Sequence, residues 1–386
     1  MKPLVCVVGG GIAGAAAALA AAREDVRVTL VDAGTGASGL CTGAIDRASV
    51  PEPPGPIGPI EDGARAILDA LGAYFVSSAG ALFVSTGGVV RPAAGGDASL
   101  LDVARLPPGP VGVVACSRPG WDAAALAVAW GERYRVFDAA ILRTADERAV
   151  PDADFAARHD DPERLAWLSE RLREAVARQG QDWAALVLPP SLGATWPRAP
   201  ELSRLAGLSC GEAIGLPGGP AGLRFEAARD QALSAAGVER LRARVMGIQR
   251  ADGAWRVLAQ GATEIDATAV VLATGGLVGG GVEYAPAEGM HATAVPYGSR
   301  PFLRLTLDAP AVLGVRGAPL ESPSSLFGTT PEALAWPWTE DCPLERAGVV
   351  STASGLFAAG DLVADAPRTW LAALEGGARA GRAAAQ

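Results

Sequence analysis

The chain of 386 residues is poor in the side chains that most catalytic and metal sites need. It has two histidines, and Lys2 is the single lysine among 33 basic residues, which excludes a mechanism through a lysine Schiff base. The five cysteines are scattered and form no C-x-x-C, so a disulfide framework and a zinc or iron–sulfur ligand set are excluded. No H-E-x-x-H, P-loop or Ser-His-Asp set is present. Hydrolase and kinase functions therefore have no support.

Excess positive charge is also missing. The net charge of −9 argues against nucleic acid or an anionic membrane as the partner. Pro3–Ala22 contains no charge and has the length of a membrane span or a signal peptide. Three adjacent glycines, Gly9 to Gly11, interrupt this segment, and Arg23 follows it at once. We expect a cytoplasmic protein with no membrane insertion and no removable leader.

A glycine-rich loop stands near the start of the chain. The apolar segment Leu4–Val8 leads into Gly9-Gly10-Gly11-Ile12-Ala13-Gly14, which is followed by an alanine-rich helix. In a dinucleotide-binding βαβ unit, Gly9 would allow a tight turn and Gly11 would let the backbone approach a pyrophosphate. Gly14 would let the helix pack on the sheet, and the N–H groups at the helix start would face the anion. Asp32, eighteen residues after Gly14, ends the next strand and is placed to accept bonds from a ribose hydroxyl.

Two later segments add to this pattern. Apolar strands end in Ala273-Thr274-Gly275-Gly276 and in Gly360-Asp361. Both should end at the carboxyl edge of the sheet, where open α/β sheets bind ligands. The small residues of Gly34–Gly43 suit close approach of a flat ring to the backbone. Cys41 within this stretch has no second cysteine nearby and is interpreted as a small buried hydrophobe.

These three motifs, in this order, resemble those of the glutathione-reductase-type flavoproteins with two dinucleotide folds. The resemblance implies that Asp361 bonds the ribityl and phosphate part of a flavin. It also implies that a helix over Thr369–Ala384 points its amino end at the flavin pyrimidine, with Glu375-Gly376-Gly377 close to that end. A partial positive charge there stabilises reduced flavin.

A closer resemblance is to the B subunit family of anaerobic glycerol-3-phosphate dehydrogenase. The similar segments are the amino-terminal glycine loop, Ser38–Asp46, Pro119–Asp122, Leu188–Gly193, Ala273–Gly276, Gly279–Glu283 and Gly360-Asp361. The resemblance implies a flavin subunit that works beside a catalytic flavoprotein subunit and an iron–sulfur, membrane-attached subunit, and that feeds electrons to a quinone. The family usually binds FMN. The glycines and Asp32 suit a dinucleotide, so we expect FAD, with FMN as the alternative.

Few residues are candidates for catalysis. His291 follows the Gly279–Gly281 loop and is a candidate general base, with a structural role as the alternative. Arg300 and Arg304 are candidate anchors for an anionic small-molecule substrate. His159 lies in a polar stretch that is typical of a solvated helix boundary.

The sequence therefore predicts an α/β chain: a Rossmann-like FAD-binding fold of the three-layer ββα type, with a second, inserted α+β domain. We expect the flavin domain to comprise residues 1–75, 240–285 and 345–386, and the inserted domain residues 76–239 and 286–344. No metal site is expected. The residues expected to contact the cofactor are Gly9, Gly11, Ile12, Ala13, Gly14, Asp32, Ala33, Ser38, Gly39, Thr42, Gly43, Val245, Ala273, Thr274, Gly275, Gly360, Asp361, Gly376 and Gly377.

Two functions fit this prediction, and a non-enzymatic nucleotide-binding regulator fits it less well because it leaves Gly360-Asp361 unexplained. The first function, favoured by the scarcity of ionisable groups near the motifs, is an accessory electron-transfer subunit. Such a subunit would pass electrons from a reduced donor, such as glycerol 3-phosphate or another hydroxy compound, through its flavin to an iron–sulfur partner. Its location would be cytoplasmic, or at the inner face of the membrane through that partner. The second is a stand-alone FAD-dependent dehydrogenase or oxidase acting on a small anionic substrate.

Overall fold

The computed structural model describes residues 2–34, 36–46, 60–251, 253–276, 278–281, 283–286, 305–309, 315–319, 355–362 and 368–386. Its central element is a parallel five-stranded sheet of order β10-β2-β1-β14-β18. The strands are β1 (Leu4–Val8), β2 (Arg27–Asp32), β10 (Glu239–Arg242), β14 (Ala269–Leu272) and β18 (Leu356–Ala358). The chain thus leaves this sheet after β2, returns at β10 and β14, and leaves once more before β18.

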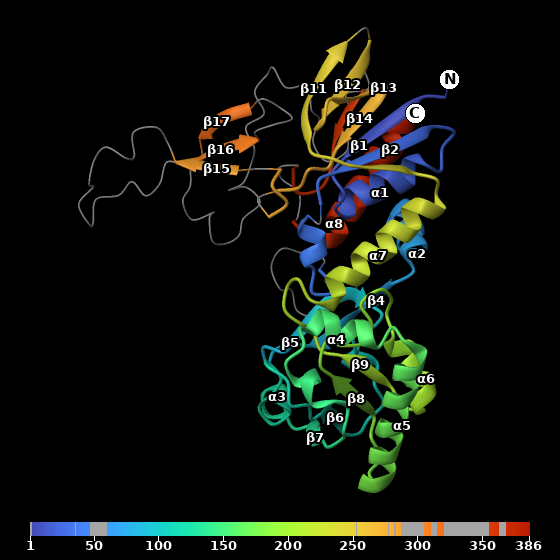
Figure 1. Ribbon diagram of the computed structural model, residues 1–386, viewed down its shortest axis with the longest axis vertical. Helices are drawn as coiled ribbons and strands as arrows, with labels where there is room; N and C mark the ends of the chain where they lie inside the picture. Colours follow the sequence, from blue (N-terminus) through green and yellow to red (C-terminus); the bar gives the residue numbers. More distant parts are fainter. Residues whose placement is uncertain are drawn as a thin grey trace, which may run out of the picture.

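Alternation along the strands places a different layer on each face of the sheet. Val5 and Val7 of β1 belong to the same core as the helices, whereas Cys6 and Val8 pack with Trp255 and the other buried residues of the meander. The helices are α1 (Ile12–Ala21), α2 (Asp62–Leu71), α7 (Pro220–Ala235) and α8 (Trp370–Ala385). The antiparallel meander consists of β11 (Val245–Ala251), β12 (Ala254–Ala259) and β13 (Thr263–Ala267). Figure 1 shows the three layers, which confirms the predicted Rossmann-like ββα fold.

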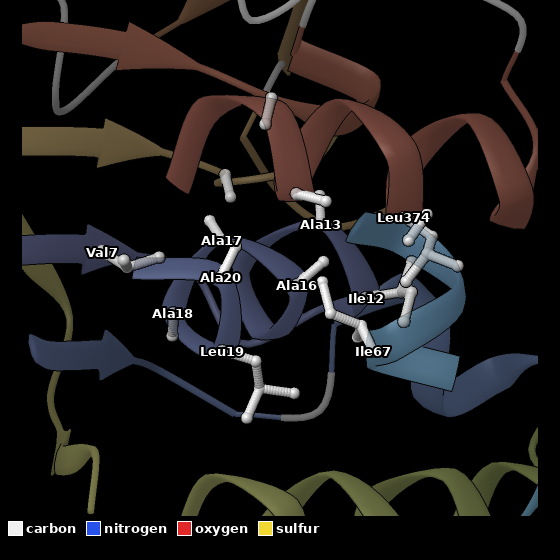
Figure 2. Close-up of a cluster of buried hydrophobic side chains, with 14 of the residues drawn as sticks. Val7, Ile12, Ala13, Ala16, Ala17, Ala18, Leu19, Ala20, Ile67 and Leu374 are labelled. Atoms are coloured by element: carbon white, nitrogen blue, oxygen red, sulfur yellow. The ribbon is translucent and has the colours of Figure 1, made fainter. Parts of the chain in front are cut away.

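Helices α1 and α8 approach each other closely because both present small residues. A Cβ added to Gly377 would overlap the carbonyl oxygen of Ala13, and one added to Gly381 would overlap that of Ala17. Figure 2 shows Ala13, Ala16 and Ala17 of α1 on the side that faces α8. Helix α8 begins at Trp370, with Thr369 as its N-cap. Gly376 and Gly377 therefore lie inside the helix and not at its amino end, where the sequence analysis expected them. Gly377 is instead part of the α1–α8 packing.

The chain between β2 and β10 forms a second region, below the nucleotide sheet in Figure 1. It contains an antiparallel sheet of order β3-β5-β4 and a parallel sheet of order β7-β6-β8-β9. This region therefore differs from the expected α+β organisation, because its larger sheet is parallel and carries helices. The strands are β3 (Ala44–Ile45), β4 (Tyr74–Val84), β5 (Val90–Asp97), β6 (Val111–Val114), β7 (Tyr134–Phe137), β8 (Ala185–Leu188) and β9 (Cys210–Glu212). The helices are α3 (Ala123–Trp130), α4 (Asp152–Arg158), α5 (Pro162–Gln179) and α6 (Ala199–Ala206), with short 3-10 turns η1 (Ala37–Leu40), η2 (Val103–Arg105) and η3 (Ala145–Arg148).

Local sequence explains where the helices of the second region begin and end. The side chain of Asp122 accepts the N–H groups of Ala124 and Ala125 at the start of α3. Asp161 caps α5 in the same way, and Gly180, at φ +59°, ends it in the left-handed conformation that glycine adopts at little cost. Each cap satisfies backbone donors or acceptors that the helix itself leaves without a partner.

Helix α7 joins the two regions. Its apolar residues Phe225, Ala228 and Leu233 lie in the core of the nucleotide region, although the sequence prediction assigned residues up to 239 to the insertion. Its Arg224 is fully buried and donates to Asp97 at 2.6 Å, to Glu212 at 2.8 Å and to the carbonyl of Gly193. Three segments of the second region are thereby bonded to one side chain of α7.

A third antiparallel sheet consists of β15 (Glu283–Pro286), β16 (Leu305–Ala309) and β17 (Val315–Pro319). Within the described ranges, no helix combines the length and the apolar character that crossing a membrane requires.

Candidate functional site

A cavity of about 710 Å³ lies at the carboxyl edge of the five-stranded sheet. It is lined by residues that follow β1, β2, β14 and β18, by the η1 turn and by the start of α8. This is the edge at which parallel sheets bind ligands. The predicted cofactor residues that line it are Gly9, Gly11, Ile12, Ala13, Asp32, Ala33, Ser38, Thr42, Val245, Ala273, Thr274, Gly275, Gly360 and Asp361.

The glycine loop has the geometry that a pyrophosphate requires. Gly9 has φ +113°, and a Cβ there would overlap the carbonyl oxygen of Ala273. A Cβ at Gly14 would overlap the carbonyl oxygen of Gly9, so this glycine sets the distance between helix and strand. Gly11 is the N-cap of α1, and the nearest atom to its added Cβ is Ser38 Oγ at 3.3 Å. The amino end of α1, with its partial positive charge, therefore opens onto the cavity.

Ser38 lies at the same helix end. Its Oγ accepts the N–H of Ile12 at 2.9 Å, and its hydroxyl hydrogen remains available to a ligand. The η1 turn that carries Ser38 packs closely on α7. The approach is so close that a Cβ at Gly222 would overlap the carbonyl oxygen of Gly39. The long-range packing of α7 thus holds the serine at the start of α1.

Asp32 provides a polar group at one end of the cavity. The residue is 2% exposed, and its Oδ2 accepts the Nε–H of Arg240 at 2.6 Å. Its Oδ1 is buried and has no hydrogen-bond partner among the described residues. A buried carboxylate oxygen without a donor, on a residue that lines a cavity, fits a ribose hydroxyl. Val245 lines the same cavity.

The carboxyl-terminal motif lies at the cavity as predicted. Gly360 has φ +71°, and a Cβ there would lie 2.7 Å from Ala13 Cβ, so this position needs glycine. Burial raises the pKa of Asp361, and the nearby Arg368 opposes this shift. Thr369 Oγ1 accepts the N–H of Ala372 at 3.1 Å, which caps α8. Trp370, the first residue of α8, also lines the cavity, which brings this helix end to the site.

Asp46 is a cavity residue to which the sequence analysis gave no role. Arg91 of β5 donates through Nη2 to both of its carboxylate oxygens at 2.5 Å. Burial raises the pKa of Asp46, while the charge of Arg91 lowers it. Its position after β3, which pairs with β5 of the second region, puts a carboxylate in the part of the cavity lining next to that region.

Cys41 also lines the cavity, and burial raises the pKa of its thiol to about 11. A thiol with this pKa is protonated at neutral pH and is a poor nucleophile, although the residue is partly exposed and not fully buried as the sequence suggested.

Some predicted residues lie elsewhere. Gly14, Gly39, Gly43, Gly376 and Gly377 do not line the cavity. Gly14 and Gly377 serve close backbone packing, and Gly43, at φ +91°, lies against Ala221 and Asp97. The three catalytic candidates, His291, Arg300 and Arg304, lie outside the described residues. No group of three or more His, Cys, Asp or Glu side chains that could hold a metal ion occurs in the described part of the chain.

The expectation for His159 is wrong. Its side chain is buried, with 1% exposure. Its Nδ1–H donates a hydrogen bond to the carbonyl oxygen of Phe155 at 3.1 Å. Its Nε2 has no partner among the described residues. Burial, with a contribution from the charge of Arg164, lowers the pKa of His159 from 6.5 to about 4. The polar neighbours in sequence do not reveal this burial, because the corner between α4 and α5 turns the ring inward.

The pKa of His159 predicts a pH dependence of stability. The folded-state pKa is below the unfolded value, so the stability contribution is complete above pH 6.5 and is lost as the pH falls toward 4. The loss should amount to about 3 kcal/mol, since each pKa unit corresponds to roughly 1.4 kcal/mol. Urea unfolding at pH 7, 5.5 and 4.5 measures it. In His159→Gln this component should disappear, and an unchanged pH profile of the variant would show that another group is responsible.

Together, the sheet order, the glycine loop and the carboxyl-edge cavity define a protein with a Rossmann-like dinucleotide-binding fold. Residues 7–72 match a family model described as an NAD(P)-binding Rossmann-like domain.

Similar solved structures include glycine oxidase from Geobacillus kaustophilus, with 15% identity and a TM-score of 0.28 over 72% of this chain and 57% of that one. CtdE in complex with FAD is similar at 12% identity and a TM-score of 0.27, over 71% of this chain and 39% of that one. A thioredoxin reductase from Gloeobacter violaceus is similar at 13% identity and a TM-score of 0.24, over 71% of this chain and 36% of that one. This chain spans less than two thirds of the length of each of these proteins. A search of curated proteins found no match. Similarity at this level assigns no activity to the chain.

Proposed function

We propose that this protein is an FAD-dependent oxidoreductase. The observation that supports this most strongly is the pairing of two features in one cavity. Asp32 presents a buried carboxylate oxygen without a donor at one end, and Gly360-Asp361 lies with the start of α8 in the same lining. The first feature suits the adenosine ribose, and the second suits the ribityl chain and ring of a flavin. FMN would leave the Asp32 end without a ligand, so FAD is preferred over FMN.

The residues of this chain would hold and orient such a cofactor. Gly11 leaves room for the pyrophosphate at the amino end of α1, and the Ser38 hydroxyl can donate to a phosphate oxygen. Asp361 could accept a hydrogen bond from a ribityl hydroxyl. The amino end of α8 would place partial positive charge near the flavin ring. When bound, FAD would supply the capacity to accept a hydride or electrons.

The role proposed first is that of an electron-transfer protein similar to the B subunit family of anaerobic glycerol-3-phosphate dehydrogenase, working with a catalytic flavoprotein and an iron–sulfur protein. The scarcity of ionisable side chains supports it. Among the described lining residues these are Asp32, Asp46, Arg244, Asp361 and Arg368, with the weakly acidic Cys41. In this role the protein would be cytoplasmic, or attached to the membrane through its partner.

A second role, a stand-alone dehydrogenase or oxidase for a small substrate, is supported by Asp46. A carboxylate held by both oxygens on Arg91 has a defined orientation, and in the cavity lining it can accept a proton. His291, Arg300 and Arg304 would add a base and anion anchors in this case. Anaerobic mixing of the isolated, FAD-loaded chain with glycerol 3-phosphate and with hydroxy acids, followed at the flavin band, separates the roles. Rapid bleaching by any of these donors would favour the stand-alone enzyme.

The cofactor itself is tested by binding. We expect the purified protein to bind FAD with the visible spectrum of a flavoprotein, and Asp32→Ala to weaken FAD binding by about 1–3 kcal/mol through loss of a charge-assisted bond to the ribose. FMN lacks this ribose, so its affinity should stay unchanged. Fluorescence titration of the apoprotein with both flavins measures the two affinities. A wild-type protein that takes up neither flavin would contradict the proposed function.

A further inference from the structure

Two arginines and one aspartate connect the glycine loop to Asp32. Arg229 of α7 is 1% exposed and donates through Nη1 to the carbonyl oxygen of Gly10 at 2.8 Å. Its Nε donates to Asp230 Oδ1 at 2.7 Å. On the other side of the same carboxylate, Arg240 Nη1 lies 2.7 Å from Asp230 Oδ2, and Arg240 Nε donates to Asp32 Oδ2. The result is a continuous chain of charge-assisted bonds from the loop to the carboxylate at the end of β2.

The two ends of this chain are in close contact in the site. A Cβ at Gly10 would lie 2.9 Å from Asp32 Cβ and 3.0 Å from its Oδ2, so the loop and the carboxylate share one tightly packed position. Arg240 occupies one oxygen of Asp32 and leaves the other, Oδ1, buried without a donor. A carboxylate that is held in this way can offer only one oxygen to a ligand, in a fixed direction.

We propose that Asp230 is a positioning residue for the adenosine-diphosphate half of the cofactor site. Through Arg229 it holds the carbonyl of the phosphate loop, and through Arg240 it orients Asp32 toward the ribose. The site thereby recognises the ribose and the pyrophosphate as one preorganised unit, which lowers the ordering cost of binding. The inference deepens the proposed function and rests on it, since it assigns to α7 and β10 the selection of a dinucleotide over FMN.

Asp230 is suited to a test because its side chain is 42% exposed and Asn has the same shape. Asp230→Asn should raise the dissociation constants of FAD and of ADP about tenfold, the effect of misorienting one charge-assisted bond. FMN, which has neither the second phosphate nor the adenosine ribose, should bind within about twofold of wild type. Arg240→Lys keeps the charge, but its ammonium group lacks the fork that joins two carboxylates, and it should shift the same affinities in the same direction.

The matched control is Glu174→Gln on α5. This residue is also an exposed acid with an arginine partner, Arg171, at 2.6 Å, and it lies in the second region. It should change none of the three affinities. A role through Asp32 further requires that Asp230→Asn raises the ADP dissociation constant by a smaller factor in the Asp32→Asn background than in the wild type, because one of its two routes is then already lost.

Isothermal titration with ADP, FAD and FMN distinguishes the outcomes. An ADP affinity that Asp230→Asn leaves unchanged, or FMN binding weakened as much as FAD binding, would overturn the inference. Wild-type protein that binds ADP but neither flavin would overturn the proposed function, while the ADP titrations of the variants would still decide the role of Asp230. Wild-type protein that binds none of the three would overturn both.

Discussion

Arg224→Ala is expected to destabilise the protein by about 3–5 kcal/mol, the cost of leaving buried charges without their partner. The guanidinium is 0% exposed, and its removal would strand the carboxylates of Asp97 and Glu212, which are 0% and 1% exposed. Each carboxylate also accepts backbone N–H groups, Asp97 from Ser99 and Glu212 from Ser191 and Leu192. Loss of Arg224 should therefore loosen three segments together. Urea unfolding followed by circular dichroism measures the change.

Two further variants show whether charge is the cause. Arg171→Ala removes an arginine from the exposed pair with Glu174 and should cost less than about 1 kcal/mol. Adding Asp97→Asn and Glu212→Gln to the Arg224 variant should recover part of the lost stability, because the stranded groups are then neutral. If the triple variant were no more stable than Arg224→Ala, lost packing rather than unpaired charge would explain the effect.

Gly11→Val and Gly14→Val are expected to fail in different ways, although they lie in the same loop. Gly11 has φ −70° and ψ −175°, a conformation open to any residue, and its added Cβ would meet only Ser38 Oγ. The valine can fold there, but it fills the space beside the amino end of α1. FAD affinity should fall at least about a hundredfold, roughly 2.8 kcal/mol, with near-normal thermal stability.

At Gly14 the added Cβ would overlap the carbonyl oxygen of Gly9, which belongs to the backbone and cannot rotate away. Gly14→Val should therefore cost about 3 kcal/mol or more in folding stability, at the upper end for overpacking. Thermal melts and flavin titration of both variants distinguish the cases. FAD binding retained by Gly11→Val would show that the loop does not hold the pyrophosphate.

Helix α7 shows what sequence patterns miss. Its role cannot be seen in the sequence, since Arg224, Arg229 and Asp230 resemble ordinary charged residues of a helix. Their partners are far away in sequence: Arg224 and Asp97 are 127 positions apart, and Arg229 and Gly10 are 219 apart. A signal was present in Glu239-Arg240-Leu241-Arg242, a charged strand that pairs with β2 and ends beside Asp32. Without the pairing of β10 with β2, however, the sequence does not show that this strand places Arg240 beside Asp32.

The same distinction applies to the cavity. Asp46 was only the last residue of a segment similar to a known family, yet it lines the cavity. His159 was expected at a solvated helix boundary, yet it is buried. Gly376 and Gly377 were expected at the cofactor because of a resemblance to a family motif. Close packing of α8 against α1 explains Gly377 instead.

The sequence by itself determined the βαβ unit of β1, α1 and β2, the return of the chain at β14 and β18, and the position of Gly9, Gly11, Asp32 and Asp361 at one sheet edge. It could do so because strand alternation, glycine turns and parallel strand ends depend on neighbouring residues and on one simple rule of sheet geometry. The tertiary structure alone decided which charges are buried, which oxygen of Asp32 remains free, and which helix holds the glycine loop. These properties depend on contacts between distant segments, where burial changes the energy of a charge by several kcal/mol and no local pattern records its partner.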